Sequence, residues 1–191
     1  QCVARVKKHN HDAKILVCGC ASENNAKQFE KDGVVYVTGT AGKDVVSLLP
    51  ETGINISDIP DEYEENGFAE RTRTRAYVKI QDGCNNFCSY CLIPYVRGRS
   101  RSRAIGSVVA EVKNRSADVK EIVLTGIDIS SYGKDIGCSL KTLAESLSDE
   151  DVRIRFGSFE VGVIDEELLN VLTNMKKFCP HFHLSLQSGS D

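Results

Sequence analysis

The sequence lacks any apolar run that approaches the roughly eighteen residues of a membrane-spanning helix. It also lacks an opening charged-then-apolar leader with a cleavage site. We therefore expect a soluble, cytoplasmic protein with no membrane partner. Eight cysteines in 191 residues could belong to a secreted disulfide scaffold, but such scaffolds are usually shorter and rich in loops. Three of the eight crowd into one short stretch, which favours thiolates held reduced around a metal.

The sequence also has little net charge, −3 at pH 7, which argues superficially against a nucleic-acid partner. The charge is unevenly distributed, because residues 71–103 hold eight basic residues and one acid, a net +7, and the rest of the chain is −10. A phosphate-bearing partner responds to a local basic surface and not to the total charge of the chain.

Four arginines of this basic segment alternate with small residues, and an extended chain with period two would project them to one side. We predict that this ridge contacts RNA phosphates. The alternatives are a solvated face, or ion pairs with acids of the linker described below. The ridge consists of Arg97, Arg99, Arg101 and Arg103.

The first part of the chain predicts a small parallel sheet. Apolar strands are expected at 14–17 and 34–38, with helices at 22–31 and 43–49. This β-α-β-α order is typical of a parallel sheet covered by helices. No element is recognised at the start of the chain, and we expect the chain to be truncated at both ends. We predict an N-terminal domain over 1–58, an acidic linker over 59–70, and a second domain over 71–191.

The second domain predicts further strand–helix units. Helices are expected over about 105–115 and 139–148 and from an N-cap at Asp165 onward, where two acids occupy the first turn. Repeated units with right-handed crossovers suggest a barrel or partial barrel. Four strands cannot close a barrel, so the predicted class is α/β with an incomplete barrel. The expected strands are 75–81, 120–125, 152–156 and 181–186.

The three crowded cysteines follow the first strand of this domain with the spacing Cys84-x3-Cys88-x2-Cys91. Three such thiolates can hold three irons of a [4Fe–4S] cluster. No fourth cysteine stands nearby, so one iron stays open for another ligand, which suits catalysis. Structural zinc usually takes four ligands in two pairs, and no second pair is close. A zinc- or RNA-binding module without catalysis is the rival interpretation, and a chance group of buried cysteines is weaker still.

The pattern Cys84-x3-Cys88-x-Tyr90-Cys91 resembles the radical S-adenosylmethionine (SAM) superfamily. The resemblance implies a partial (β/α)6 barrel whose open iron binds the amino and carboxylate groups of SAM. It further implies that an electron from the cluster splits SAM into methionine and a 5′-deoxyadenosyl radical. The backbone around Tyr90 would lie against the adenine of SAM.

Four further segments are similar to the methylthiotransferases of this superfamily. The resemblance implies a transferase that adds a methylthio group at C2 of an adenosine at position 37 of tRNA, served by an electron donor such as flavodoxin or ferredoxin. Asn85, Asn86 and the arginine run favour N6-threonylcarbamoyladenosine as the substrate, with isopentenyladenosine or ribosomal protein S12 as alternatives. The four segments are 76–84 (AYVKIQDGC), 91–103 (CLIPYVRGRSRSR), 121–126 (EIVLTG) and 186–191 (LQSGSD).

The same resemblance implies a second [4Fe–4S] cluster in the N-terminal domain, with Cys20 as its third ligand. Its two partners would lie upstream of Gln1, so this cluster is expected to be incomplete in the chain. Glu160 matches a family acid and is a candidate SAM contact. Gln187 and Ser188 are candidates for SAM or substrate contact, because polar residues alternate with apolar ones along the last strand and would face the barrel interior.

Overall fold

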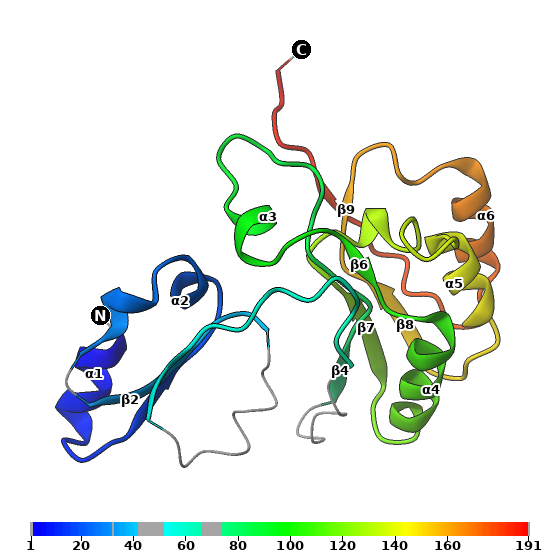
Figure 1. Ribbon diagram of the computed structural model, residues 1–191. Helices are drawn as coiled ribbons and strands as arrows, with labels where there is room; N and C mark the ends of the chain where they lie inside the picture. Colours follow the sequence, from blue (N-terminus) through cyan, green and yellow to red (C-terminus); the bar gives the residue numbers. More distant parts are fainter. Residues whose placement is uncertain (1, 32, 42–51, 66–73, 191) are drawn as a thin grey trace. The chain divides into compact units, whose positions relative to one another are not determined.

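The computed structural model describes residues 2–31, 33–41, 52–65 and 74–190. The chain forms two compact units (Figure 1). Unit 1 comprises Gln1–Asn66 and Asn86–Gly98, and unit 2 comprises Gly67–Asn85 and Arg99–Asp191. The chain therefore leaves unit 2 after Asn85, contributes a segment to unit 1, and re-enters unit 2 at Arg99.

Unit 1 contains a three-stranded parallel sheet in the order β1 (Ile15–Val17), β2 (Val34–Thr38) and β3 (Gly53–Asn55). The two predicted strands and their parallel pairing are confirmed. Strand β3 was not predicted, because its three residues are all exposed and carry no apolar alternation. The helix predicted at 43–49 lies outside the described residues.

The helices of unit 1 differ from the prediction in three places, one of which is the short helix α3 (Ile93–Val96), which was not predicted. The predicted helix at 22–31 is wrong in its bounds: α2 (Cys20–Asn24) ends where Asn25 turns to φ −156°, and a separate 3-10 turn, η1 (Ala26–Phe29), follows. A helix that was not predicted, α1 (Cys2–His9), stands near the start of the chain. None of its residues is buried, and its last turn carries Lys7, Lys8 and His9, which favour a helix C-terminus.

Unit 2 contains a three-stranded parallel sheet in the order β4 (Arg75–Lys79), β7 (Glu121–Thr125) and β8 (Arg153–Phe156). Gly157 separates β8 from β9 (Ser158–Glu160), which pairs in parallel with β10 (His183–Ser185). The remaining elements are α4 (Ile105–Ser116), the 3-10 turn η3 (Ile129–Ser131), α5 (Leu140–Ser146), α6 (Glu166–Asn174), and an antiparallel pair of β5 (Gln81–Asp82) with β6 (Arg101–Ser102).

Most elements of unit 2 agree with the sequence prediction to within about two residues. The predicted cap of α6 is confirmed, because Asp165 Oδ1 accepts a hydrogen bond from the Leu168 amide at 2.7 Å. The apolar side chains of the last strand are not buried, because Leu184 and Leu186 are 48% and 65% exposed. Of the described strands, β10 pairs with β9 alone, and only Phe182 of this segment packs against the core.

The two faces of the unit 2 sheet are chemically different. Ala76, Val78, Ile122, Leu124 and Ile154 face one side and are buried in a common core with side chains of α4, α5 and α6. Figure 1 shows these three helices along that face. Because side chains alternate along a strand, the other face carries the residues between them, including several arginines. A parallel sheet with helices outside and polar groups inside is the expected arrangement of an incomplete α/β barrel with a ligand site.

Short helices make up most of the helical content. Within the described ranges, no helix combines the length and the hydropathy that crossing a bilayer requires.

Candidate functional site

The base of the cysteine loop in unit 2 is organised by Gln81, which is fully buried. Its Nε2 donates to the carbonyl oxygens of Asp82 (2.8 Å) and Gly83 (2.7 Å) and to Ser100 Oγ (3.0 Å). Its Oε1 accepts from the amide of Asp128 at 2.7 Å. One side chain thus joins the entry and the exit of the loop to the turn after β7. Gln81 was not among the predicted site residues, although an amide directly after an apolar strand was a usable signal.

Two further contacts fix where the loop leaves and re-enters unit 2. The amide of Ser100 donates to Asn85 Oδ1 at 3.1 Å. Gly83 has φ +72°, a conformation that glycine adopts without steric cost, and its amide donates to Asp82 Oδ1 at 2.8 Å. The backbone before Cys84 is therefore held by side chains as well as by the β5–β6 pair.

The three loop cysteines are all free thiols. Cys84 is half-buried in unit 2, with its Sγ 4.0 Å from Asp128 Oδ2. In unit 1, Cys88 is exposed and Cys91 is half-buried, and the amide of Cys91 donates to the carbonyl oxygen of Cys88 at 2.9 Å. Reduced thiols in a polar turn are the donor chemistry of an iron–sulfur cluster. In the part of the chain that the structure describes, no three Cys, His, Asp or Glu side chains are arranged around a metal position, so the ligand assignment stays a prediction from the motif.

An aromatic contact lies beside Cys88. Phe87 has φ +48°, and its ring meets that of Tyr95 edge-on at a centroid distance of 5.7 Å. Tyr90 is 76% exposed, so its backbone is accessible to a ligand. Its predicted contact with adenine is not tested by these observations.

Cys20, the predicted ligand of a second cluster, is the first residue of α2 and is half-buried. Arg97 Nε donates to Cys20 Sγ at 3.1 Å, with both residues in unit 1. Cys18, two residues before Cys20, is exposed. The described contact of Arg97 is thus with a thiol, and its role in RNA contact stays a prediction.

The predicted arginine ridge is wrong for two of its four members. Arg99 is exposed, but Arg101 and Arg103 are 6% and 3% exposed. Arg103 forms an ion pair with Glu111, whose other carboxylate oxygen lies 2.6 Å from Arg115 Nε. Arg101 lies in β6 and points its Nη2 toward Asp82 Oδ2 at 3.9 Å. Arginine does alternate with small residues in this segment. Because β6 pairs with β5, however, the side chains of Arg101 and Arg103 point toward acids inside unit 2 and not toward solvent.

The three predicted SAM contacts other than Tyr90 lie at one edge of unit 2. Glu160 is exposed at the end of β9, and its amide donates to Ser130 Oγ at 2.8 Å. Gln187 and Ser188 are exposed and follow β10, with Gln187 at φ +64°. Because β9 and β10 run in parallel with Ser185 opposite Glu160, these residues all follow the carboxyl ends of neighbouring strands. That edge is where parallel barrels place their ligand sites.

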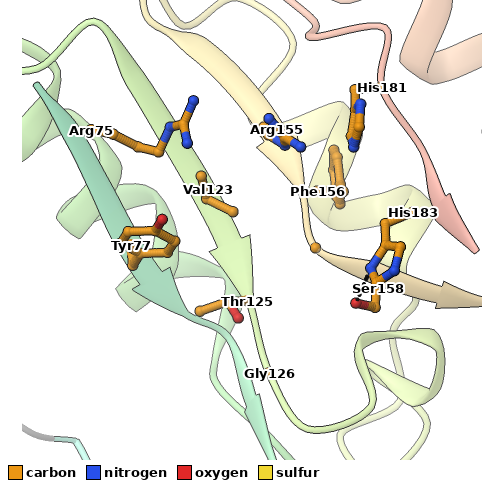
Figure 2. A pocket seen from close by; sticks show the side chains of 11 residues that line it. Arg75, Tyr77, Val123, Thr125, Gly126, Arg155, Phe156, Ser158, His181 and His183 are labelled. Atoms are coloured by element: carbon orange, nitrogen blue, oxygen red, sulfur yellow. Dashed lines mark hydrogen bonds between the residues drawn. The ribbon is translucent and has the colours of Figure 1, made fainter.

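A cavity of about 300 Å³ lies on the open face of the unit 2 sheet (Figure 2). Arg75 and Tyr77 reach it from β4, and Arg155 reaches it from β8. His181 and His183 close it on the side of β10, where His183 Nδ1 lies 2.7 Å from Ser158 Oγ. A polar interior was predicted, but Arg155 was not among the predicted site residues. Its signal was the alternation of arginine with apolar residues in 153–156 (RIRF).

A family model described as the radical SAM superfamily matches residues 78–191, more than half of the chain. The chain belongs to the radical SAM superfamily. Membership implies a [4Fe–4S] cluster and SAM as cofactors. The matched region includes the Cys84-x3-Cys88-x2-Cys91 motif and the whole of strands β7 and β8.

Individual relatives carry two kinds of name. The chain is 35% identical to a protein named threonylcarbamoyladenosine tRNA methylthiotransferase from Rickettsia prowazekii, over all of this chain and 48% of the relative. A protein of that name from Aquifex aeolicus is also 35% identical, over all of this chain and 50% of the relative. A tRNA-2-methylthio-N(6)-dimethylallyladenosine synthase from Lachnoclostridium phytofermentans is 32% identical over 98% of this chain and 45% of the relative. The chain thus spans about half the length of these curated relatives.

Proposed function

We propose that the chain carries the catalytic core of a radical SAM methylthiotransferase that modifies C2 of N6-threonylcarbamoyladenosine at position 37 of tRNA. The observation that carries this proposal is the cysteine motif within a superfamily match, together with 35% identity over the whole chain to relatives named for that activity. Isopentenyladenosine is the alternative substrate, because relatives named for the dimethylallyl compound are 31–35% identical. Ribosomal protein S12 is a more distant alternative.

In this proposal Cys84, Cys88 and Cys91 would hold the cluster, which when bound supplies the electron that cleaves SAM and so generates the radical needed to activate an unreactive C–H bond. The chain's own residues prepare that site. Gln81 and Asn85 fix the base of the loop through their contacts with Ser100. A loop held in this way costs less conformational entropy when its thiols take up a ligand.

Three of the proposed SAM contacts lie at the carboxyl ends of β9 and β10, and the fourth, at Tyr90, lies in unit 1. Glu160 offers an exposed carboxylate, Gln187 and Ser188 offer exposed polar side chains, and the backbone at Tyr90 offers hydrogen-bonding groups for an adenine edge. These groups suit a zwitterionic amino acid joined to a nucleoside, because such a ligand presents an ammonium, a carboxylate and a base edge.

The remaining parts of the proposal concern the N-terminal domain and the partners. Cys20 would be one ligand of a second [4Fe–4S] cluster, with Arg97 as its hydrogen-bond donor. The proposed N-terminal domain covers residues 1–58, the linker covers 59–70, and the radical SAM core covers 71–191. The partners would be tRNA, contacted through Arg99 and the exposed part of the basic segment, and an electron donor such as flavodoxin or ferredoxin in the cytoplasm.

The test follows the hydrogen atom that the reaction must remove. The chain is reconstituted with iron and sulfide without oxygen, reduced, and given SAM with tRNA deuterated at C2 of the target adenosine. We expect deuterium from N6-threonylcarbamoyladenosine in 5′-deoxyadenosine, and none from isopentenyladenosine at the same position. Deuterium transfer only from isopentenyladenosine would show that isopentenyladenosine is the substrate. SAM left intact, with one zinc and no iron per chain, would support the zinc- or RNA-binding module instead.

A further inference from the structure

The cavity on the open face of the unit 2 sheet is lined by basic side chains and by no acidic ones. Arg75, Arg155, His181 and His183 contribute to its wall, and no Asp or Glu side chain lines it. The guanidinium groups of Arg75 and Arg155 stay charged at all ordinary pH values. A cavity wall of this composition favours a ligand with negative charge.

The two arginines of the cavity are not equivalent. Arg75 Nε lies 2.6 Å from Glu121 Oε1, and a hydrogen bond with Tyr77 followed by the charge of Glu121 raises the pKa of Arg75 above its ordinary value. Arg155 is half-buried, and within the described residues no acid lies within ion-pair distance of it. A half-buried charge without a counterion is costly. Of the groups in this cavity, Arg155 is therefore the one whose charge an anionic ligand would stabilise most.

The rest of the wall is mixed in character. Tyr77 and Val123 present apolar surface, and Thr125 and Ser158 present hydroxyls. The volume of about 300 Å³ is at the lower end of the range for small-molecule sites, which suits one substituent of a ligand better than a whole nucleotide. Thr125 and Gly126 bring the cavity up to the carboxyl end of β7, so a group entering from the edge that carries Glu160 could reach it.

We infer that this cavity is the subsite for the threonylcarbamoyl group of the substrate adenosine, with Arg155 pairing with the threonyl carboxylate. The inference rests on the proposed function and deepens it, because it names the residue that distinguishes the two candidate substrates. The threonylcarbamoyl group carries a carboxylate, a hydroxyl and a methyl group, which match the guanidinium, the hydroxyl side chains and the apolar wall. A dimethylallyl group has no charge and would leave Arg155 uncompensated. An Arg–carboxylate pair in a partly buried site is among the stronger hydrogen-bonded contacts.

The experiment measures binding of free nucleosides to the 191-residue chain, with the Arg155 Nε–H signal in NMR as the local reporter. The probes are N6-threonylcarbamoyladenosine, its methyl ester, N6-dimethylallyladenosine, inorganic phosphate and SAM. We expect the carboxylate form to bind roughly ten-fold or more tightly than its ester and to shift the Arg155 signal. Arg155→Met should abolish this difference, and Arg155→Lys should retain part of it.

Arg153→Met is the matched control. Arg153 lies two residues earlier on the same strand, is exposed, and does not line the cavity. The preference for the carboxylate should survive this substitution. Thermal unfolding of each variant shows whether the fold is retained, and Arg155→Lys provides the comparison if Arg155→Met does not fold.

The inference is overturned if the acid and its ester bind equally, if none of the nucleosides binds, or if phosphate or SAM shifts the Arg155 signal as strongly as the threonylcarbamoyl nucleoside does. None of these results bears on iron uptake or SAM cleavage, which test the proposed function. Failure of the subsite is therefore distinguishable from failure of that function.

Discussion

Arg103 and Glu111 form a buried ion pair that ties the strand after the cysteine loop to the first long helix of unit 2. The two residues are 3% and 6% exposed, and Glu111 also accepts a hydrogen bond from Arg115 Nε at 2.6 Å. Tyr132 completes the arrangement, because its hydroxyl donates to the backbone oxygen of Arg103 at 2.6 Å. The Arg103–Glu111 ion pair thus fixes the segment that follows the cysteine loop to the core of unit 2.

Replacing Arg103 should unfold the protein more readily rather than merely weaken RNA binding. Arg103→Met leaves Glu111 with Arg115 as its one remaining described partner, and breaking a buried pair typically costs about 3–5 kcal/mol. We expect a loss near the lower figure, because Arg115 still compensates part of the charge. Urea unfolding measures it, with exposed Arg99→Met as the matched control. A change below about 1 kcal/mol for Arg103→Met would mean that the pair is not a structural anchor.

Arg99 and Arg101 should behave differently toward tRNA. Arg99 is exposed, whereas Arg101 is buried beside Asp82. Arg99→Ala should weaken tRNA binding and reduce the slope of log affinity against log salt by about 0.7–0.9, the value for one lost phosphate contact. Arg101→Ala should lower stability and leave the slope unchanged. Lys113→Ala, an exposed change on α4, is the control, and an unaltered slope for Arg99→Ala would remove this residue from the RNA surface.

Tyr132 should make the protein less stable in alkali. Burial, with smaller contributions from Cys138 and Asp135, raises the pKa of Tyr132 above its ordinary value. The unfolded chain releases this proton near pH 10 and the folded chain keeps it, so the free energy of unfolding should fall by about 1.4 kcal/mol per pH unit above pH 10. Below that pH the contribution is constant. Tyr132→Phe should reduce this slope by that amount, and identical slopes for the two proteins between pH 10 and 11 would contradict the assignment.

The strands and longer helices of unit 2 were predictable because each has one apolar face. The side chains that the apolar periodicity selects are buried in the structure, as in Ile122 and Leu124 of β7 and in Leu168 and Leu172 of α6. The N-cap at Asp165 was predictable for the same reason, since a cap is a local interaction. Helix α1 and strand β3 were not predictable, because neither buries a side chain and neither therefore leaves a pattern in the sequence.

The site was predictable only where its chemistry is local. The cysteine motif could be recognised because cluster ligands are crowded into one loop. The burial of Arg101 and Arg103 could not be predicted, because their ion-pair partners, Asp82 and Glu111, come from other segments of the chain. Arg155 was missed because an arginine on an open sheet face and one in a ligand cavity look alike in sequence. Their difference arises when β10 closes the cavity.

The central claim is that three thiolates of one loop hold an iron cluster with an open position. Its most direct test is the iron content of the oxygen-protected chain after reconstitution, compared between the unaltered protein, Cys88→Ala and Cys138→Ala. Cys138 lies outside the loop, and burial, with Asp135, raises the pKa of its thiol, so it is a poor ligand and a suitable control. We predict about four irons per chain in the unaltered protein and in Cys138→Ala, and a loss of iron and of SAM cleavage in Cys88→Ala. An unaltered chain that takes up no iron, or a Cys88→Ala chain that keeps its iron and still cleaves SAM, would contradict the account.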